Sequence, residues 1–365
     1  MKLESLRLTN FRNFQTALIR PGTGVNIFIG DNGSGKTNLL EAVFTLCLGR
    51  SQRGARDAML IRDGGDDYFR LEGIGTVGGR EVRLACAYQS GGRKKITVDD
   101  NPVRVSELFE LFSVISMAPD DVILFSGSPS ARRRFMDLHL SQASPSYLAD
   151  LTDYTRALTQ KNSFLKSRQG GHCPFDPLLI QYGCRLMIAR TKFIDFLKDL
   201  APGYYNRIVG GDLSSSTSVF TCRYMPNVPV EAAEDIADRF EAKLAESRRK
   251  EDILETAIVG PHRDDIEFTI AGLPVRGYGS QGEMRSAAFA AMMAASDFLE
   301  KRRGEKPLLL LDEIFAELDH TRRDNLARLF GGFEQMFLTT AVEPPTILND
   351  RAVFFQIKAG EVIQE

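Results

Sequence analysis

The apolar and polar positions near the N-terminus predict strands that lead into a helix. Leu6 and Leu8 alternate with polar neighbours, and the run 25–29 is mostly apolar. Apolar residues recur at helical spacing over 36–48. Short alternating stretches within 68–98 are broken by paired glycines, which is typical of antiparallel hairpins. We therefore expect strands, hairpins and one helix in the first part of the chain.

The middle of the chain has a different, helix-rich pattern. It covers 128–200, with turn signals near Gly170, Gly171 and Pro174. Two helices of about 25 residues, each about 40 Å long, would flank that break. Residues 229–249 carry the pattern of another amphipathic helix. We interpret this part as an α-helical arm inserted between two halves of one head.

The pattern returns to alternating strands and helices after about residue 253. A helix is expected over 280–302, a buried strand over 308–311, a helix over 319–330 and a strand over 335–338. This alternation implies parallel pairing with right-handed crossovers. The expected fold class is therefore α/β with a mixed sheet and an inserted helical arm.

A glycine-rich segment follows the first apolar run and matches G-x-x-x-x-G-K-[ST]. Glycines allow backbone N–H groups to converge on phosphate oxygens, and the helix that begins here adds its partial positive charge. Lys36 would reach the β- and γ-phosphates of ATP, and the Thr37 hydroxyl would bind Mg²⁺. The predicted nucleotide-binding residues of this phosphate loop are Gly30, Asp31, Asn32, Gly33, Ser34, Gly35, Lys36 and Thr37.

The buried strand 308–311 ends in two carboxylates, Asp312 and Glu313. Ligands of parallel sheets bind at the carboxyl ends of the strands, so Asp312 is expected beside the Mg²⁺ held by Thr37. Glu313 is then the expected catalytic residue, which polarises a water aimed at the γ-phosphate. An ordinary Asp-Glu pair at a helix N-terminus is the alternative.

A second candidate anion site precedes the 280–302 helix. Ser280 is a good N-cap, and Glu283 three residues later completes a capping box. A plain capping box is one interpretation. The position between the phosphate loop and the acidic strand resembles the signature motif of ABC-type ATPases, which implies that Ser280 and Gly282 complete the nucleotide site of a second protomer.

The same class resemblance covers Glu317-Leu318-Asp319, which stands where ABC-type ATPases carry their D-loop, and implies that Asp319 contacts nucleotide. The chain is thus expected to be an ABC-type P-loop ATPase head that dimerises on ATP. The expected domains are an N-terminal ATPase lobe with the phosphate loop, the helical arm, and a C-terminal ATPase lobe with the signature and the acidic strand, at 1–127, 128–252 and 253–365.

The composition limits the cellular compartment and the binding partners that we expect for this chain. The five cysteines include no CxxC pair, which argues against a zinc ribbon or a disulfide framework and fits a reducing compartment. No apolar signal region follows the N-terminus, and no stretch of about eighteen apolar residues occurs. A cytoplasmic protein without a membrane partner is expected. With a net charge of -2, any DNA binding would have to come from local basic clusters. These clusters are at 132–134, 248–250, 301–303 and 322–323, and a solvated face is the alternative interpretation of each.

Four stretches together resemble the RecF family, and the resemblance covers essentially all 365 residues. The segment from Pro119 to Asp137, with Arg132-Arg133-Arg134 inside it, is the most specific because it is long and irregular. The four stretches are 8–14, 119–137, 260–265 and 311–319.

The resemblance implies a DNA-dependent ATPase of recombinational repair and replication. Such a protein would clamp single- or double-stranded DNA at gaps or stalled forks as an ATP-bound homodimer. It would work with RecO and RecR, help RecA to load and support the SOS response. Arg12 and Asn13 match positions that line the nucleotide in heads of the related SMC type.

The chain departs from these patterns at four places. Glu283 stands where many RecF members have Gln, which puts a negative charge near a partner's γ-phosphate. Of a family Ser-His-Arg-Thr-like string, only Ser51 and Arg53 match. Thr339 and Thr340 stand where ABC transporters carry a switch histidine, and no glutamine is assigned to a Q-loop. A transporter ATPase subunit, an SMC-like bridge with scarce turnover and a P-loop kinase are the competing interpretations.

Overall fold

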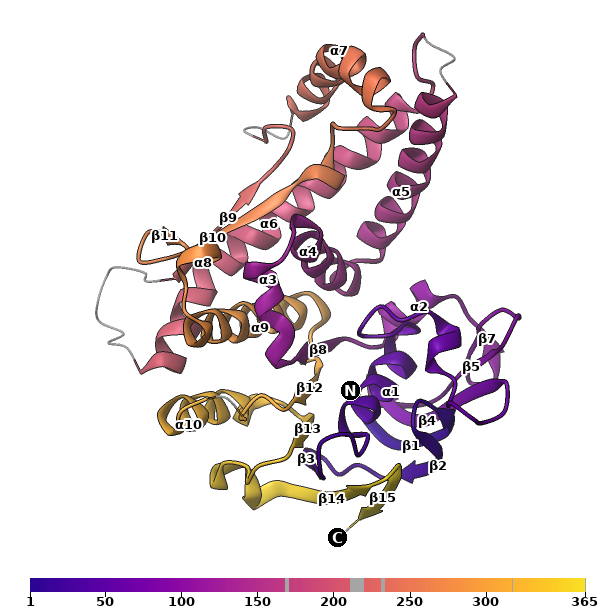
Figure 1. Ribbon diagram of the computed structural model, residues 1–365, viewed down its shortest axis with the longest axis vertical. Coiled ribbons are helices and arrows are strands. Elements are labelled where there is room, and N and C mark those ends of the chain that lie inside the picture. The colour runs from indigo at the N-terminus through magenta and orange to yellow at the C-terminus, as the bar shows by residue number, and fades with distance from the viewer. Residues whose placement is uncertain (168–170, 211–219, 231–233, 317, 365) are drawn as a thin grey trace. The chain divides into compact units, whose positions relative to one another are not determined.

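The chain divides into two compact units. The computed structural model describes residues 1–167, 171–210, 220–230, 234–316 and 318–364 (Figure 1). Unit 1 is formed by 1–121, 206–213 and 295–365, and unit 2 by 122–205 and 214–294. Unit 2 is thus inserted into unit 1 along the sequence.

A six-stranded sheet in unit 1 carries the strands that the alternating pattern predicts. Its order is β15-β14-β3-β13-β12-β8, and every pair is parallel except β14 with β15. β12 and β13 are buried along their whole length, as strands covered on both faces should be. The strands are β3 (Gly24–Ile29), β8 (Val114–Met117), β12 (Leu308–Asp312), β13 (Gln335–Thr340), β14 (Ala352–Lys358) and β15 (Glu361–Gln364).

The N-terminal strands form a second, antiparallel sheet in unit 1, in the order β2-β1-β4-β5-β6-β7. Glycines at positive φ, Gly78 and Gly79, make the β4–β5 hairpin turn, as predicted. Its strands are β1 (Lys2–Phe11), β2 (Phe14–Ile19), β4 (Tyr68–Val77), β5 (Arg80–Gln89), β6 (Lys95–Val98) and β7 (Asn101–Pro102).

Helix α1 (Lys36–Leu48) packs against strands of both sheets, including β4, β5, β12 and β13. It is therefore buried on nearly all sides, which explains why its sequence is apolar around most of its circumference. The other helical segments of unit 1 are η1 (Asp57–Leu60), α2 (Val105–Leu111), η2 (Pro119–Val122, ending in unit 2), α10 (His320–Leu329), η4 (Phe330–Gly332) and η5 (Thr346–Arg351).

Unit 2 is dominated by helices, but its described part also contains a three-stranded sheet that the sequence pattern did not predict. The order is β11-β10-β9, all antiparallel. The elements are α3 (Ile123–Ser126), α4 (Pro129–Ala143), α5 (Pro145–Lys166), α6 (Asp176–Val209), β9 (Phe220–Met225), α7 (Ile236–Leu254), η3 (Pro261–Arg263), β10 (Asp265–Ile270), β11 (Leu273–Pro274), α8 (Val275–Tyr278) and α9 (Gln281–Arg303). The last residues of α6 and of α9 are grouped with unit 1.

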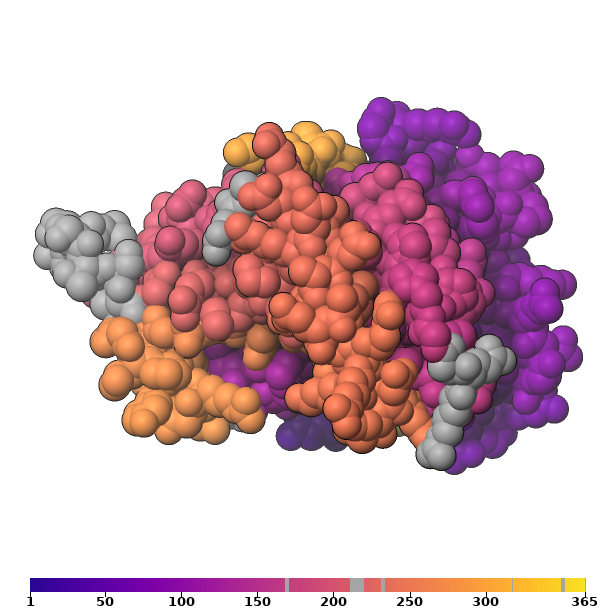
Figure 2. Space-filling view, turned by 90° about the horizontal axis from the view of Figure 1, so that it is seen from above, coloured from indigo at the N-terminus to yellow at the C-terminus, as the bar shows by residue number. Residues whose placement is uncertain are grey.

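The two long helices expected around the break near 170 are α5 and α6, with 22 and 34 residues. The helix expected over 229–249 begins later, at Ile236, and runs on to Leu254. Its buried face is set by Ile236, Phe240 and Leu244, which pack with Met187 of α6. α7 also packs on α5, and both helices are visible in the surface of Figure 2.

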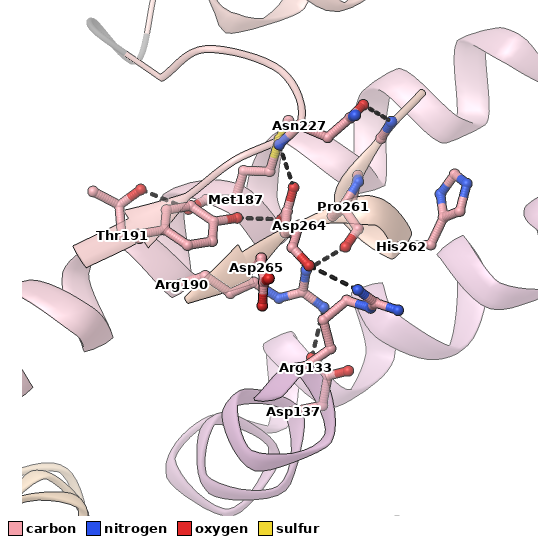
Figure 3. A network of polar contacts seen from close by, with 12 residues as sticks. Arg133, Asp137, Met187, Arg190, Thr191, Asn227, Pro261, His262, Asp264 and Asp265 are labelled. Carbon is pink, nitrogen blue, oxygen red and sulfur yellow. Dashed lines mark hydrogen bonds and ion pairs between the residues drawn. The ribbon is translucent and has the colours of Figure 1, made fainter. Parts of the chain in front are cut away.

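A buried arginine joins the helices of unit 2 to its sheet. Arg190 of α6 donates to Asp137 at 2.8 Å and to Asp264 at 2.9 Å, and to the Pro261 carbonyl at 2.6 Å. Figure 3 shows its guanidinium lying between these groups. Tyr224 of β9 donates to the same Asp264 carboxylate. Burial raises the pKa of Asp264, and the Arg190 charge opposes that rise.

The sequence-based division differs from the compact units at its second boundary. Residues 253–294 were assigned to the C-terminal ATPase lobe, yet they group with the helical unit. The physical reason is bonding: β10 pairs with β9, and Asp265 forms an ion pair with Arg132 of α4. The limits 1–127, 128–252 and 253–365, for two lobes of one head and an inserted arm, stay a prediction.

All five cysteines are free thiols, as expected. Cys47, Cys86, Cys173 and Cys222 are buried, and Cys184 is half-buried. Burial raises the pKa of the Cys47 thiol to about 12, so this group is inert rather than reactive.

Candidate nucleotide site and signature segment

The phosphate loop leaves β3 at Ile29 and enters α1 at Lys36, in unit 1. Gly33 and Gly35 have φ of 82° and 116°, in the region that favours glycine. A Cβ on Gly35 would lie 2.4 Å from the Nδ2 of Asn13. Asp31, Asn32 and Gly33 are exposed at the turn of the loop. The loop therefore has the open, glycine-dependent backbone that the sequence predicts.

Asn13 braces this loop from the β1–β2 turn. Its Nδ2 donates to the Ser34 carbonyl at 2.9 Å, and its Oδ1 accepts from Nδ2 of Asn38 at 2.9 Å. The Gly360 amide donates to the same Ser34 carbonyl at 3.2 Å. Asn13 thus fixes the loop backbone, and the expectation that it also lines the nucleotide stays a prediction.

Arg12 is engaged with protein groups. Its Nε donates to Oε2 of Glu41 at 2.9 Å, and its Nη1 donates to the Met59 carbonyl at 3.0 Å. Glu41 is fully buried and also accepts from Ser51 at 2.5 Å. Arg12 therefore ties the segment after α1 to that helix. Its predicted contact with nucleotide is untested.

The Lys36 ammonium lies across the inside of the loop and is 4% exposed. It donates to the carbonyls of Gly30 at 2.6 Å and Asp31 at 3.0 Å. It also forms an ion pair with Oε1 of Glu313 at 2.9 Å. The loop lysine and the carboxylate after β12, 277 positions apart by subtraction of their numbers, therefore meet in space.

Asp312 lies between two hydroxyl groups at the carboxyl end of β12. Its Oδ1 accepts from Thr37 at 2.9 Å and from Thr339 at 2.7 Å. Burial raises the pKa of Asp312, while the bonds from Thr339 and Thr37 lower it. The parallel register, in which Asp312 pairs with Thr339, places these groups together. Thr37 and Asp312 are therefore neighbours, and their predicted joint binding of Mg²⁺ stays a prediction.

Glu313 is held in a fixed orientation. Its φ is 50°, and its amide donates to the Thr339 carbonyl at 3.1 Å. Its Oε2 accepts from the Ala341 amide at 2.9 Å, while Oε1 meets Lys36. The carboxylate therefore faces the inside of the phosphate loop. Its catalytic role stays a prediction.

The residues present fit a magnesium–nucleotide ligand. The Ser34 hydroxyl is buried and has no hydrogen-bond partner among the described residues, so it is available to a phosphate oxygen. Thr37 and Asp312 present hard oxygen donors 2.9 Å apart. The described part of the chain has no cluster of three or more His, Cys, Asp or Glu that could hold a metal alone. Mg²⁺ usually binds through one or two carboxylates together with substrate phosphates, and Asp312 would supply such a carboxylate.

Two residues near the site were not found by sequence reasoning. Thr339 was noted only as the absence of a histidine, although a polar residue ending a buried strand was the available signal. Asp121 follows β8, the neighbour of β12. Burial raises its pKa to about 7, with Asp120 and Asp312 adding to the rise. No sequence pattern indicated that Asp121 lies close to Asp312.

The signature segment lies in unit 2, at the start of α9. The Ser280 amide and hydroxyl donate to Oε2 of Glu283 at 2.8 and 2.7 Å, and the Glu283 amide donates back to the Ser280 hydroxyl at 3.3 Å. This is the capping box that the sequence predicts. Whether Ser280 and Gly282 also bind a partner's nucleotide is not tested by these contacts.

The predicted D-loop is only partly described, because Glu317 lies outside the described residues. Asp319 is the N-cap of α10, and its carboxylate accepts from the Arg322 amide at 2.9 Å. Its contact with nucleotide stays a prediction.

Arg132 and Arg133, inside the family segment, both bond to protein groups. Arg132 is buried and donates to Asp265 at 2.5 Å and to the Gly127 carbonyl at 3.0 Å. Arg133 donates to the Asp264 carbonyl at 2.7 Å. Both guanidinium groups are therefore engaged with protein groups.

His262 also has a structural role. It accepts a hydrogen bond at Nδ1 from Tyr154, because its Nε2 must donate to the Ala257 carbonyl. Burial lowers the pKa of His262 to about 4, so it is neutral near pH 7.

A phosphate loop, a carboxylate pair at the end of a parallel strand and a mixed sheet together define an ABC-type P-loop ATPase head. The family model described as RecF/RecN/SMC N terminal domain matches residues 2–359. The chain belongs to the RecF family. It is 34% identical to the DNA replication and repair protein RecF of Symbiobacterium thermophilum over 376 residues, covering 100% of this chain and 98% of that protein. It is 36% identical to the RecF of Streptococcus gordonii over 367 residues, covering 99% and 100%.

Solved structures agree with this assignment. A structure of the recombination mediator protein RecF with ATP is similar with a TM-score of 0.89 and 28% identity, covering 100% of this chain and 97% of that one. An SMC head bound to a winged-helix domain of ScpA has a TM-score of 0.56 at 16% identity, which shows the shared fold alone. Family membership sets aside the transporter-subunit and kinase interpretations. None of the helices in the described residues combines the length and apolarity that a bilayer span needs.

Proposed function

We propose that this chain is an ATP-driven DNA-binding protein of replication and recombinational repair. The observation that carries the proposal is the convergence of Lys36, Thr37, Asp312 and Glu313 on one phosphate loop. Relatives that match the whole chain are named DNA replication and repair proteins, which supplies the cellular setting. The finer form of the proposal is a dimer that clamps DNA at gaps or stalled forks, works with RecO and RecR in loading RecA, and supports the SOS response from the cytoplasm.

Each residue of the site has a chemical task in ATP cleavage. The loop amides and Ser34 bind phosphate oxygens, and Lys36 moves from the Gly30 and Asp31 carbonyls to neutralise the β- and γ-phosphates. Thr37 and Asp312 would hold Mg²⁺, which neutralises the charge that develops on the phosphates. Glu313, released from Lys36, orients the attacking water and accepts its proton.

The second half of the site comes from another copy of the chain. The amide and hydroxyl of Ser280 are hydrogen-bond donors at the start of a helix, which is a favourable place for a phosphate. In two copies related by a two-fold axis, the phosphate loop of each copy can face the Ser280 segment of the other. ATP then stabilises the dimer to the extent that it binds the dimer better than the monomer.

DNA contact in this dimer is to the phosphate backbone and carries little sequence information. Because Arg132 and Arg133 are bonded to protein groups, the other basic clusters are the candidates. Arg249 and Lys250 on α7 are exposed. A dimer presents each cluster twice, which suits a groove along DNA.

Retention of gapped duplex DNA on a filter tests the proposal. We expect stronger retention with ATP and Mg²⁺ than with ADP, with a steep decrease as salt is raised. Lys36→Ala should lose the difference between ATP and ADP, because the point charge on the β- and γ-phosphates is gone. Lys306→Ala, which removes a lysine paired at the surface with Glu300, is the matched control and should behave as wild type. Equal retention with ATP and ADP in the wild type would contradict the proposal.

A further inference from the structure

The short helical turn α8, between the β10–β11 hairpin and the signature segment, exposes an aromatic ring. Tyr278 is 71% exposed, the second-highest value among the large hydrophobic side chains described as exposed. Leu273, in the preceding strand β11, is 55% exposed. Single exposed apolar residues are common, so exposure alone does not indicate a function for Tyr278. Its position in the fold must be considered as well.

The backbone that carries Tyr278 is anchored. Val275 is 1% exposed and lies among the residues that line a hollow of about 270 Å³ with Phe125 and Phe268. The Gly279 amide donates to the Val275 carbonyl at 3.0 Å. Between them Gly277 turns the chain sharply, with φ of 90°. The ring is thus presented to solvent by an anchored turn in α8, just after β11; Figure 1 labels both elements.

Tyr278 lies close in sequence to Ser280, and therefore close to the proposed interface between two copies of the chain. This ATP-dependent interface is called the seam below. Tyr278 stands two positions before Ser280, and two residue steps span at most about 7 Å. If the donors of Ser280 reach the γ-phosphate held by another copy, the neighbouring Tyr278 must meet that copy as well. An aromatic ring with one polar end is the residue type that protein interfaces favour.

We propose that Tyr278 is the aromatic anchor of the ATP-dependent seam, buried in the dimer against the phosphate-loop unit of a second copy. This inference rests on the proposed function, since it requires the Ser280 seam. It assigns Tyr278 to dimer stability rather than to ATP binding by the monomer. The surface consists of Leu273, Tyr278 and the turn between them, and its occupant is another molecule of the same chain.

The absence of tryptophan from the sequence allows a direct test. In Tyr278→Trp, the introduced ring is the only tryptophan, so its emission reports its own burial. ATP with Mg²⁺ should shift the emission to shorter wavelength, the shift should grow with protein concentration, and ADP should have no effect. Tyr68→Trp, at a 38% exposed position on β4, is the control and should not respond.

Sedimentation supplies the second measurement. Tyr278→Ala should weaken the ATP-dependent dimer at least tenfold while ATP binds the monomer with unchanged affinity, and Tyr278→Phe should restore most of the loss. If the wild type and Tyr278→Trp form ATP-dependent dimers but the emission stays that of an exposed ring, Tyr278 is not at the seam and only this inference fails. If the wild type forms no ATP-dependent dimer, the proposed function fails. If Tyr278→Ala dimerises normally but loses DNA, the ring stacks on bases instead and the inference is wrong.

Discussion

Glu283 is the residue at which this chain departs most clearly from the RecF pattern, and its contacts indicate the consequence. One carboxylate oxygen accepts from both the amide and the hydroxyl of Ser280. The donors proposed for a partner's phosphate are therefore already bound to a negative group. A phosphate that takes them must displace that group and then remain near its charge.

Glu283→Gln should tighten the ATP-dependent dimer by roughly tenfold, or about 1.4 kcal/mol. The amide oxygen of glutamine can still cap the helix, while the repulsion of the phosphate disappears. Glu241→Gln, which removes the same charge from an exposed position on α7, is the control and should leave the dimer unchanged. The dimer dissociation constant in ATP, measured by sedimentation for the wild type and both variants, tests this prediction. An unchanged or weaker dimer in Glu283→Gln would show that the Glu283 carboxylate does not compete with a partner's phosphate for the Ser280 donors.

At the residue scale, short sequence motifs predict which residues of the candidate nucleotide site lie together. The phosphate loop and the Thr37–Asp312 pairing followed from a motif and from the rule that ligands meet the ends of parallel strands. The ion pair of Lys36 with Glu313 and the brace from Asn13 could not be predicted. They depend on which strands become neighbours and on rotamers set by packing, and one sequence does not specify these.

At the scale of elements, the buried Arg190 holds unit 2 together. It bonds Asp137 on α4, the Pro261 carbonyl in η3, and Asp264, which lies between η3 and β10. Removing one member of a buried ionic network leaves the others desolvated and unpaired, which costs about 3–5 kcal/mol.

Arg190→Met should therefore lower the free energy of unfolding by that amount, measured by urea denaturation. Arg185→Met on the same helix is the matched control. Arg185 pairs with Asp150, but its side chain is 55% exposed, so its loss should cost less than about 1 kcal/mol. Similar small losses in both variants would show that the network does not stabilise the unit.

Element prediction succeeded where the apolar pattern is long and one-sided or fully buried. Helix α1 was placed at 36–48 and is found there, and β12 and α9 lie within one or two residues of expectation. β9 was missed because its six residues carry only a short alternation beside a helix. The start of α7 was placed too early, because the amphipathic pattern extends before the first residue that is buried, Ile236.

At the scale of the whole molecule, the central claim is that ATP joins two copies through Ser280. The phosphate loop belongs to unit 1 and Ser280 to unit 2, so each copy brings both halves of the proposed seam. Glu313→Gln should retain ATP and prolong the dimer, because the shape of the side chain is kept while the base is lost. This variant makes the nucleotide-bound dimer long-lived enough to measure.

The most direct test is sedimentation velocity of Glu313→Gln with and without Ser280→Arg, in ATP and in ADP. We predict dimers only for Glu313→Gln in ATP. The double variant should bind ATP as a monomer and stay monomeric, because a bulky charge at the seam blocks the partner. ATP-dependent dimers of undiminished strength in the Ser280→Arg background would contradict the composite site.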